Sequence, residues 1–358
     1  MNYFKKIAEI IDYEGWGSIF NRSVDLICYN YLINVFRRKQ DFDNWKNLKN
    51  KFEGERAFLI GNGPSLNATP LYFLKNEITI AFNRFNLMFE RLNWKPTLYT
   101  TVDERVALDN TDELNDIVKQ LDYCFFPDIH PRGCVDFRKF IQNRENIFWL
   151  KLVTSGFFRE LPNVGLNGTV ANVGIQILAY LGIKNIYLVG LDANYDDHNS
   201  VKQENKRDWK SIRDDDPNHF DPRYFGKGKK YHRPRINDIV LPGYQKAKKF
   251  SESIGIQIFN ATVGGKLEIF DRVDFESLFH YTDAEKFFLL FNEKAAIFQN
   301  IYELKNRSIK LSSPMDNYPD PIYISKADIA LRLIPKIIFT HIPYGPIEGD
   351  YFFIKRDN

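Results

Sequence analysis

Short runs of apolar residues, each ending in glycine or a small polar residue, recur through the middle of the chain. We expect six of these runs to be β-strands: residues 57–60, 78–82, 98–102, 123–126, 186–189 and 256–259. They are largely apolar throughout instead of alternating apolar with polar residues, which is typical of parallel strands buried on both faces. Helix-like segments separate several of them. The pattern therefore predicts an α/β protein with a doubly wound, mostly parallel sheet.

Several segments have a helical pattern. The clearest runs from Val170 to Leu181 and is followed by Gly182, the residue type that most often ends a helix. Residues 1–50 are also expected to be helical, because apolar residues recur there at three- and four-residue spacing. These residues are Val24, Ile27, Cys28, Tyr31, Leu32 and Val35, and the cations of residues 37–39 follow them. We expect a helix that docks on the main domain, with a membrane-surface or oligomer helix as the alternative.

These patterns divide the chain into three parts. Residues 1–55 are expected to form a helical N-terminal extension and residues 56–280 the α/β domain. Residues 281–358 are expected to form a C-terminal appendage, with a helix over residues 284–304 and a proline-rich tail. Within the domain, residues 196–238 are polar and charged, so we expect an active-site loop or lid there.

Polar residues follow the expected strands where the strands end. They are Asn62, Asn83, Asp103, Asp192 and Asn260. Because open parallel sheets bind ligands at the carboxyl ends of their strands, these residues predict a single crevice.

The first strand ends in a glycine-rich turn, Gly61-Asn62-Gly63-Pro64-Ser65. Its glycines allow a close approach of the backbone to a ligand, and its amides are candidates to bind a phosphate. The turn lacks the lysine of a Walker loop and the third glycine of a dinucleotide motif. An ordinary strand-to-turn connection is the alternative.

A basic tract lies inside the expected lid. It contains Arg223, Lys227, Lys229, Lys230, Arg233 and Arg235, with no acidic residue between positions 223 and 235. Such a tract is suited to close over a phosphate or an anionic sugar, and a solvated loop is the alternative.

Two histidines accompany the tract and are candidates for a general base, His219 and His232. The cations around His232 favour its neutral, proton-accepting form, whereas three aspartates precede His219. We therefore expect His232 to be the base. The aspartates at 214–216 and 196–197 are possible metal ligands, but such runs more often form solvated turns.

Composition narrows the class of protein. The 358 residues are 44% apolar and 27% charged, with a net charge of +3, so bulk charge does not predict nucleic-acid binding. No apolar run is long enough to cross a membrane, and the N-terminus has no secretory signal pattern. The three cysteines, Cys28, Cys124 and Cys134, are unpatterned. They favour a reducing, cytoplasmic location over a disulfide scaffold or a cysteine zinc site.

Three segments occur in an order that resembles a known group of enzymes. They are LIGNGPSL at residues 59–66, AFNRF at 81–85 and GTVANVGIQILAYLGIKNIYLVGLD at 168–192. This order resembles the bacterial sialyltransferases of glycosyltransferase family 42. It resembles still more the domain shared by motility-associated flagellin glycosyltransferases and an archaeal hydroxymethylpterin diphosphokinase. NHFDPRYFGKG at 218–228, Tyr231-His232 and NATVGGKLEIFDRVDF at 260–275 fit this second group, so the resemblance spans residues 56–275.

The resemblance implies a Rossmann-like, inverting glycosyltransferase. Such an enzyme would transfer a nonulosonic, sialic-acid-like sugar from a CMP-sugar donor to a surface glycan or protein acceptor. His232 best matches the catalytic histidine, with His219 as the alternative, and Val170 stands where the sialyltransferases have a serine. The implied nucleotide and donor residues are Gly61, Asn62, Gly63, Ser65, Asn83, Asp103, Asn167, Gly168, Thr169, Asp192, Tyr224 and Tyr231.

Transfer from a CMP-sugar requires no obligatory metal cofactor. Amides, hydroxyls and cations of the protein suffice to stabilise the negative charge on its single leaving phosphate. One rival hypothesis is an ATP- and Mg²⁺-dependent pterin diphosphokinase, with Asp103 and Asp192 as metal ligands. A second is a non-catalytic scaffold in a surface-polysaccharide pathway. The expected partners are the nucleotide-sugar donor and a glycan or glycoprotein acceptor. Two further points stay open at this stage: peripheral association with the inner face of the cell membrane, and homo-oligomerisation.

Overall fold

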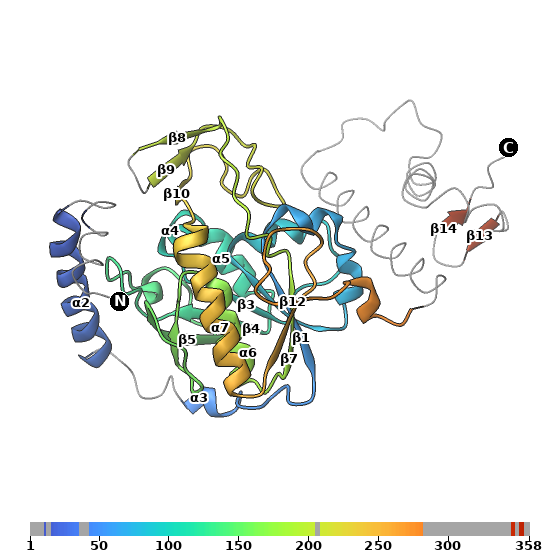
Figure 1. Cartoon of the computed structure of the whole chain (residues 1–358), viewed down its shortest axis with the longest axis horizontal. Coiled ribbons are helices and arrows are strands. Elements are labelled where there is room, and N and C mark those ends of the chain that lie inside the picture. Colours follow the sequence, from blue (N-terminus) through green and yellow to red (C-terminus); the bar gives the residue numbers. More distant parts are fainter. Residues whose placement is uncertain are drawn as a thin grey trace, which may run out of the picture. The chain divides into compact units, whose positions relative to one another are not determined.

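Nine strands of the described residues form one sheet (Figure 1). The computed structural model describes residues 11, 16–35, 43–204, 208–281, 345–347 and 351–353. The spatial order is β12-β11-β7-β1-β2-β3-β4-β5-β6, and all neighbouring strands run parallel. The strands are β1 (Arg56–Ile60), β2 (Ile78–Phe82), β3 (Leu98–Thr100), β4 (Tyr123–Pro127), β5 (Ile147–Val153), β6 (Asn163–Gly165), β7 (Asn185–Val189), β11 (Gln257–Asn260) and β12 (Asp271–Arg272). The protein therefore has the expected α/β, Rossmann-like architecture.

All six expected strands are present in this sheet, which contains three further strands that the sequence analysis missed, β5, β6 and β12. β6 and β12 have three and two residues, too few to carry a hydrophobic period. β5 is longer, but Lys151 interrupts its apolar run.

Helices pack on this sheet. α6 (Val170–Tyr180) contacts β1 and β2 and lies beside α7 (Leu241–Ser253) in Figure 1. Gly182 follows its C-cap residue Leu181 and has φ +91°, as expected for a residue that ends a helix. The other α-helices of the described residues are α2 (Gly17–Val35), α3 (Asp43–Lys46), α4 (Glu104–Asp109) and α5 (Thr111–Val118). Short 3-10 turns lie at Pro64–Ala68, Leu71–Leu74, Asn83–Met88, Phe137–Lys139 and Glu276–Leu278, and a π-helical turn lies at Ile236–Val240.

The order of the strands creates a switch point between β1 and β7. From β1 the chain builds outward through β2 to β6 on one side, and then returns to add β7, β11 and β12 on the other. The connections that leave β1 and β7 therefore depart in opposite directions. The space outside their carboxyl ends is the preferred ligand position in such sheets.

The N-terminal extension is helical, but its docking face was predicted incorrectly. The Tyr29 hydroxyl donates to the Leu152 carbonyl at 2.6 Å and is buried, so it sets the rotation of α2. Val24, Ile27 and Tyr31, which we expected to dock, are instead exposed. Residues 37–39 lie outside the described residues.

The expected lid contains a small antiparallel sheet in the order β10-β9-β8. Its strands are β8 (Val201–Gln203), β9 (Asp208–Ser211) and β10 (Lys230–His232). The segment from 196 to 238 is thus a folded insertion, apart from residues 205–207, which lie outside the described residues.

The chain separates into two compact units. One comprises residues 1–70, 76–87 and 96–278, and the other residues 71–75, 88–95 and 279–358. In the second unit Phe73 stacks on Phe279 and Tyr281, and β13 (Gly345–Ile347) pairs antiparallel with β14 (Tyr351–Phe353). The expected helix over 284–304 lies outside the described residues. Among the described residues, no helix has the length and apolar character needed to span a membrane.

Candidate functional site at the carboxyl edge of the sheet

The turns after β1 and β7 are joined at the switch point. The Gly61 amide donates to the Val189 carbonyl at 2.7 Å, and the Gly63 amide donates to the Gly190 carbonyl at 2.9 Å. The Ser65 hydroxyl donates to Asp192 Oδ2 at 2.9 Å. Gly61, Gly63, Ser65 and Asp192, four of the predicted donor residues, therefore lie together.

The two glycines permit this close approach. A Cβ on Gly61 would lie 2.3 Å from the Gly190 carbonyl oxygen, and one on Gly63 would lie 1.5 Å from Asp192 Oδ2. Their amides are bonded to the end of β7, so they are not turned toward a phosphate as the sequence suggested. Glycine is needed at positions 61 and 63 because the turns after β1 and β7 pack too closely to leave room for a Cβ.

Asp192 is a partly buried carboxyl group at this edge. Burial raises its pKa above the usual range, although the hydrogen bonds from Ser65 oppose the shift. Perturbed carboxyl groups in clefts are candidates for functional residues.

Asn62 has an unsatisfied acceptor. Its Nδ2 donates to the Phe82 carbonyl at 3.2 Å, which ties the turn after β1 to the end of β2. In the described part of the chain its Oδ1 is buried without a hydrogen-bond partner. Because buried acceptors are rarely left unpaired, this oxygen marks a position suited to a donor group of a ligand.

Asn83 is held by its neighbours. Its backbone has φ +50°, a left-handed conformation that asparagine tolerates better than most residues. Its Oδ1 accepts from the Thr101 hydroxyl at 2.8 Å, and its side chain hydrogen bonds to Tyr224. Burial raises the pKa of Tyr224, so this phenol stays protonated. Tyr224, from the insertion, is therefore joined to the end of β2.

His219 lies on the same part of the insertion. Its Nδ1 is 2.7 Å from Asp216 Oδ2, and its ring stacks on Tyr224 with centroids 3.8 Å apart. Burial would raise the pKa of Asp216, but the hydrogen bond from His219 and two backbone amides outweigh it and leave that pKa lowered. The next residue, Phe220, donates its amide to the Asn62 carbonyl at 3.0 Å.

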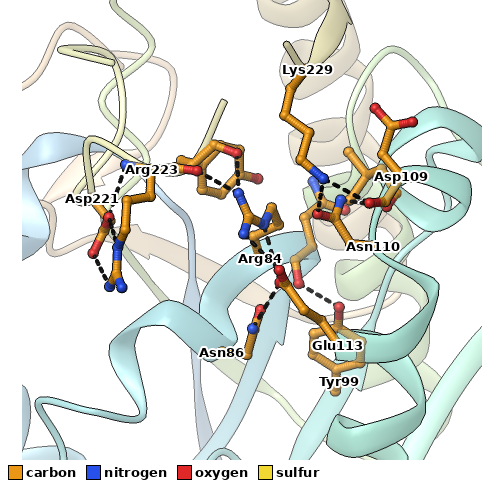
Figure 2. A network of polar contacts seen from close by, with 12 residues as sticks. Arg84, Asn86, Tyr99, Asp109, Asn110, Glu113, Asp221, Arg223 and Lys229 are labelled. Carbon is orange, nitrogen blue, oxygen red and sulfur yellow. Dashed lines mark hydrogen bonds and ion pairs between the residues drawn. The ribbon is translucent and has the colours of Figure 1, made fainter. Parts of the chain in front are cut away.

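Arg84 fixes this segment to the sheet (Figure 2). Its guanidinium pairs with Glu113 and donates to the carbonyls of Arg223 and Tyr224. Burial would raise the pKa of Glu113, but Arg84 and Asn86 outweigh it and lower that pKa. Sequence reasoning missed Arg84, although it stands inside the AFNRF motif directly after β2.

His232 occupies a second position on the insertion. It faces Asp208 across β10 and β9, with Nδ1 2.8 Å from Oδ1, and Arg105 approaches the same carboxylate at 3.2 Å. Each histidine therefore lies beside an aspartate. Nearby charge does not favour His232 over His219 as the general base, as the sequence suggested it would. The preceding Tyr231 is buried and stacks on Phe225 at 4.2 Å.

Most cations of the basic tract have partners within the protein. These are Arg223 with Asp221, Lys230 with Glu204, Arg233 with Asp197, Arg235 with Asp238, and Lys229 with the Asp109 carbonyl and Asn110. Figure 2 shows Lys229 and Arg223 directed at these partners. The tract therefore stabilises the insertion. Lys227 is exposed, and its amide donates to Asp214.

Other predicted residues have structural roles. Asp103 caps α4 by accepting from the amides of Arg105 and Val106 at 2.9 and 3.0 Å. Thr169 caps α6, where its hydroxyl accepts from the Ala171 amide at 3.3 Å.

Asn167 and Asn260 each tie two backbone segments together. The Asn167 side chain accepts from the Gly156 amide and donates to its carbonyl. Asn260 donates to the Leu267 carbonyl at 2.6 Å. Gly168 has φ +90° and directly precedes the cap of α6. Asn167, Gly168 and Thr169 thus shape the entry into this helix.

A further pair was missed from the sequence. His130, buried after β4, has its Nε2 3.4 Å from Glu104 Oε2 at the start of α4. The position of His130 just beyond the fourth apolar run was its only signal.

The expected magnesium ligands do not fit a shared ion. Asp103 follows β3 and Asp192 follows β7, and β1 and β2 lie between these strands. Three strand spacings amount to about 14 Å, and Asp103 is already engaged as a helix cap. Within the described ranges, no group of three or more His, Cys, Asp or Glu residues is arranged to hold a metal ion.

Comparisons with known proteins confirm the resemblance inferred from the sequence motifs. Residues 29–198 match the family model described as 6-hydroxymethylpterin diphosphokinase MptE-like. A search of the curated proteins found no match.

Two solved structures show similarity at low identity. The MAf glycosyltransferase from Magnetospirillum magneticum AMB-1 is 12% identical with a TM-score of 0.39, over 81% of this chain and 46% of that chain. This chain therefore spans less than half of that protein. The sialyltransferase CstII from Campylobacter jejuni, in complex with the substrate analogue CMP-3FNeuAc, is 12% identical with a TM-score of 0.36, over 61% of this chain and 86% of that chain.

Proposed function

We propose, from the motif resemblance over residues 56–275, that this chain is a glycosyltransferase that binds a nucleotide-sugar donor outside β1, β2 and β7. The donor is a CMP-activated, sialic-acid-like sugar, and the acceptor is a glycan or a glycoprotein. The observation that carries the proposal is the buried, unpaired Oδ1 of Asn62 at the switch point. Ribose hydroxyls and the amino group of cytosine are donors that would satisfy it.

The turn that carries Asn62 and the insertion segment bonded to it through Phe220 also carry hydroxyl groups that would suit an anionic ligand. Tyr224 presents a protonated phenol beside Asn83, and the Ser65 hydroxyl lies in the same turn as Asn62. Fixed hydroxyl and amide groups stabilise charge that develops on a leaving phosphate without reorganisation during the reaction.

Transfer to an acceptor hydroxyl requires a general base. His219 Nδ1 hydrogen bonds to Asp216, and His232 Nδ1 lies 2.8 Å from Asp208 Oδ1, so in each ring Nε2 is the nitrogen for proton transfer. We propose His232 as the base, as the motif resemblance implies, with His219 as the alternative. Displacement of CMP in one step breaks the bond from the anomeric carbon to the phosphate oxygen and forms the new glycosidic bond. The acceptor proton passes to the histidine, and the anomeric centre inverts.

The family match also favours a second candidate, an ATP-dependent pterin diphosphokinase. Phosphoryl-transfer enzymes of this kind rely on bound magnesium. Asp103 and Asp192 do not fit a shared ion, so we derive no step through a metal.

Ligand binding separates the two candidates. A thermal-shift panel with CMP, CDP, UDP, GDP and ATP measures which nucleotide stabilises the native state. We expect CMP to give the largest rise in Tm, without added magnesium. A rise with ATP that requires magnesium, and none with CMP, would establish the diphosphokinase. No rise with any nucleotide would favour a scaffold and contradict both enzymes.

A further inference from the structure

An apolar stripe runs along the outward side of α2. Phe20, Val24, Ile27 and Tyr31 are spaced by four, three and four residues, which places them on one face of α2, and Trp16 directly precedes the helix, four residues before Phe20. Their exposed fractions are 72, 46, 71, 61 and 76%, respectively. Exposed apolar surface of this extent marks an interaction site.

The opposite side of α2 holds the helix on the domain through polar contacts. Asp25 Oδ2 accepts from the Gly133 amide at 2.9 Å, and the Asp25 carbonyl accepts from the Cys134 thiol at 3.1 Å. Tyr29 donates to the Leu152 carbonyl on the same side. These contacts direct the apolar stripe away from the sheet.

The chemistry of the stripe matches a lipid surface. Trp16 and Tyr31 stand near its two ends, and tryptophan and tyrosine are the side chains that prefer the membrane interface. The only charged residues in α2 are Arg22 and Asp25. Because Asp25 is bonded to Gly133, the stripe carries no acidic group that an anionic surface would repel.

The sequence adds positive charge at the end of this helix. After Val35 it continues as Phe-Arg-Arg-Lys, with three cations at positions 37–39, before Asp41 and Asp43. An anionic lipid surface complements these cations.

We propose that α2 is a membrane-surface helix that lays its apolar stripe into the headgroup region of an anionic bilayer. Aromatic and aliphatic side chains supply the apolar burial, and the cations of residues 37–39 add attraction to acidic headgroups. The helix does not span the bilayer. The domain is thereby kept at a membrane surface.

Vesicle co-sedimentation of the full chain tests this proposal. The probes are vesicles of phosphatidylcholine alone and vesicles that also contain phosphatidylglycerol. We expect binding to the anionic vesicles, and a loss of at least tenfold in partitioning for the double variant Phe20→Glu/Ile27→Glu. The matched control, Leu108→Glu/Ile212→Glu, changes two residues that are 51 and 45% exposed elsewhere on the domain, and should bind like the wild type.

Charge and self-association are tested separately. Replacing residues 37–39 with glutamine should weaken binding to anionic vesicles by roughly 100-fold while leaving the melting temperature unchanged. The proposal fails if the wild type does not sediment with anionic vesicles, or if both double variants bind equally. A wild-type dimer in light scattering that Phe20→Glu/Ile27→Glu converts to a monomer, with no vesicle binding, would show that a second copy covers the stripe.

Discussion

Arg84 and Glu113 form a two-point ion pair, with Nη2 2.8 Å from Oε1 and Nε 3.2 Å from Oε2. The same guanidinium donates to the Arg223 and Tyr224 carbonyls, so one side chain after β2 holds a segment 140 residues further along the chain. The position of Tyr224 beside Asn83 depends on this pair.

Glu113→Gln should destabilise the protein by roughly 1–3 kcal/mol at pH 7, because it leaves the buried Arg84 charge without its carboxylate. The pKa of Glu113 is lowered from 4.5, so its contribution is present above that value and is lost as pH falls through the lower, folded pKa. Urea unfolding from pH 7 down to acid measures the difference between wild type and variant, which should shrink below pH 4.5. Glu160→Gln, in an exposed pair with Lys49, is the control and should have a much smaller effect on stability, because solvent screens an exposed ion pair. Equal costs for the two variants would contradict the anchoring role.

Gly63→Ala should disrupt the switch point by steric contact. Gly63 has φ −70°, which alanine adopts without strain, but the added methyl would lie 1.5 Å from Asp192 Oδ2. The Asp192 carboxyl must move away from Ser65, which we expect to cost about 1–3 kcal/mol and to reduce CMP binding. Thermal melting with and without CMP measures both effects. Gly17→Ala, where nothing lies within 4 Å of the new methyl, is the control. A Gly63→Ala protein with wild-type stability and affinity would show that this packing is not required.

Asn62→Ala should abolish the CMP-induced rise in Tm while the protein remains folded. The variant loses the buried Oδ1 acceptor and one hydrogen bond to Phe82, so we expect a stability cost near 1 kcal/mol. Calorimetric titration with CMP measures the affinity. Asn67→Ala removes a similar bond, to the Phe220 carbonyl, and should retain CMP binding. Unchanged CMP affinity in Asn62→Ala would remove Asn62 from the donor site.

His232→Ala should lower turnover by roughly 10² to 10⁴ while donor affinity is kept, as expected for loss of a general base. Asp208→Asn should lower turnover less, because it changes the orientation of His232 without removing it. Steady-state assays with a CMP-sugar donor should be run in parallel on His219→Ala and Asp216→Asn. If turnover falls only in this second pair, His219 is the base and the two assignments must be exchanged.

Activity should persist in EDTA, because fixed protein groups and not a metal are proposed to meet the charge on the leaving phosphate. Turnover is measured before and after chelation, and again after addition of magnesium. Complete loss that magnesium restores would favour the diphosphokinase and contradict the proposed metal-independent transfer.

The sequence by itself determined the class of fold. Buried parallel strands are apolar on both faces. The strands β1, β2, β4, β7 and β11 can therefore be predicted as short apolar runs, without knowing which strands they pair with. The end of α6 is equally local, because a left-handed residue such as Gly182 is marked by its type. Strands as short as β6 and β12 were missed because their stability comes from neighbours in the sheet.

Tertiary structure decided what the polar residues do. The sequence identified Asn62, Asp192 and His219, but only folding showed that Ser65 reaches Asp192 and that Arg84 fixes Tyr224. It also showed that acids remote in sequence, such as Asp197 and Glu204, pair with the basic tract. The outward rotation of α2 likewise depends on Leu152 and Gly133. Local patterns encode burial and backbone conformation, whereas the partner of a charge or a hydrogen bond is set by which distant segments the sheet brings together.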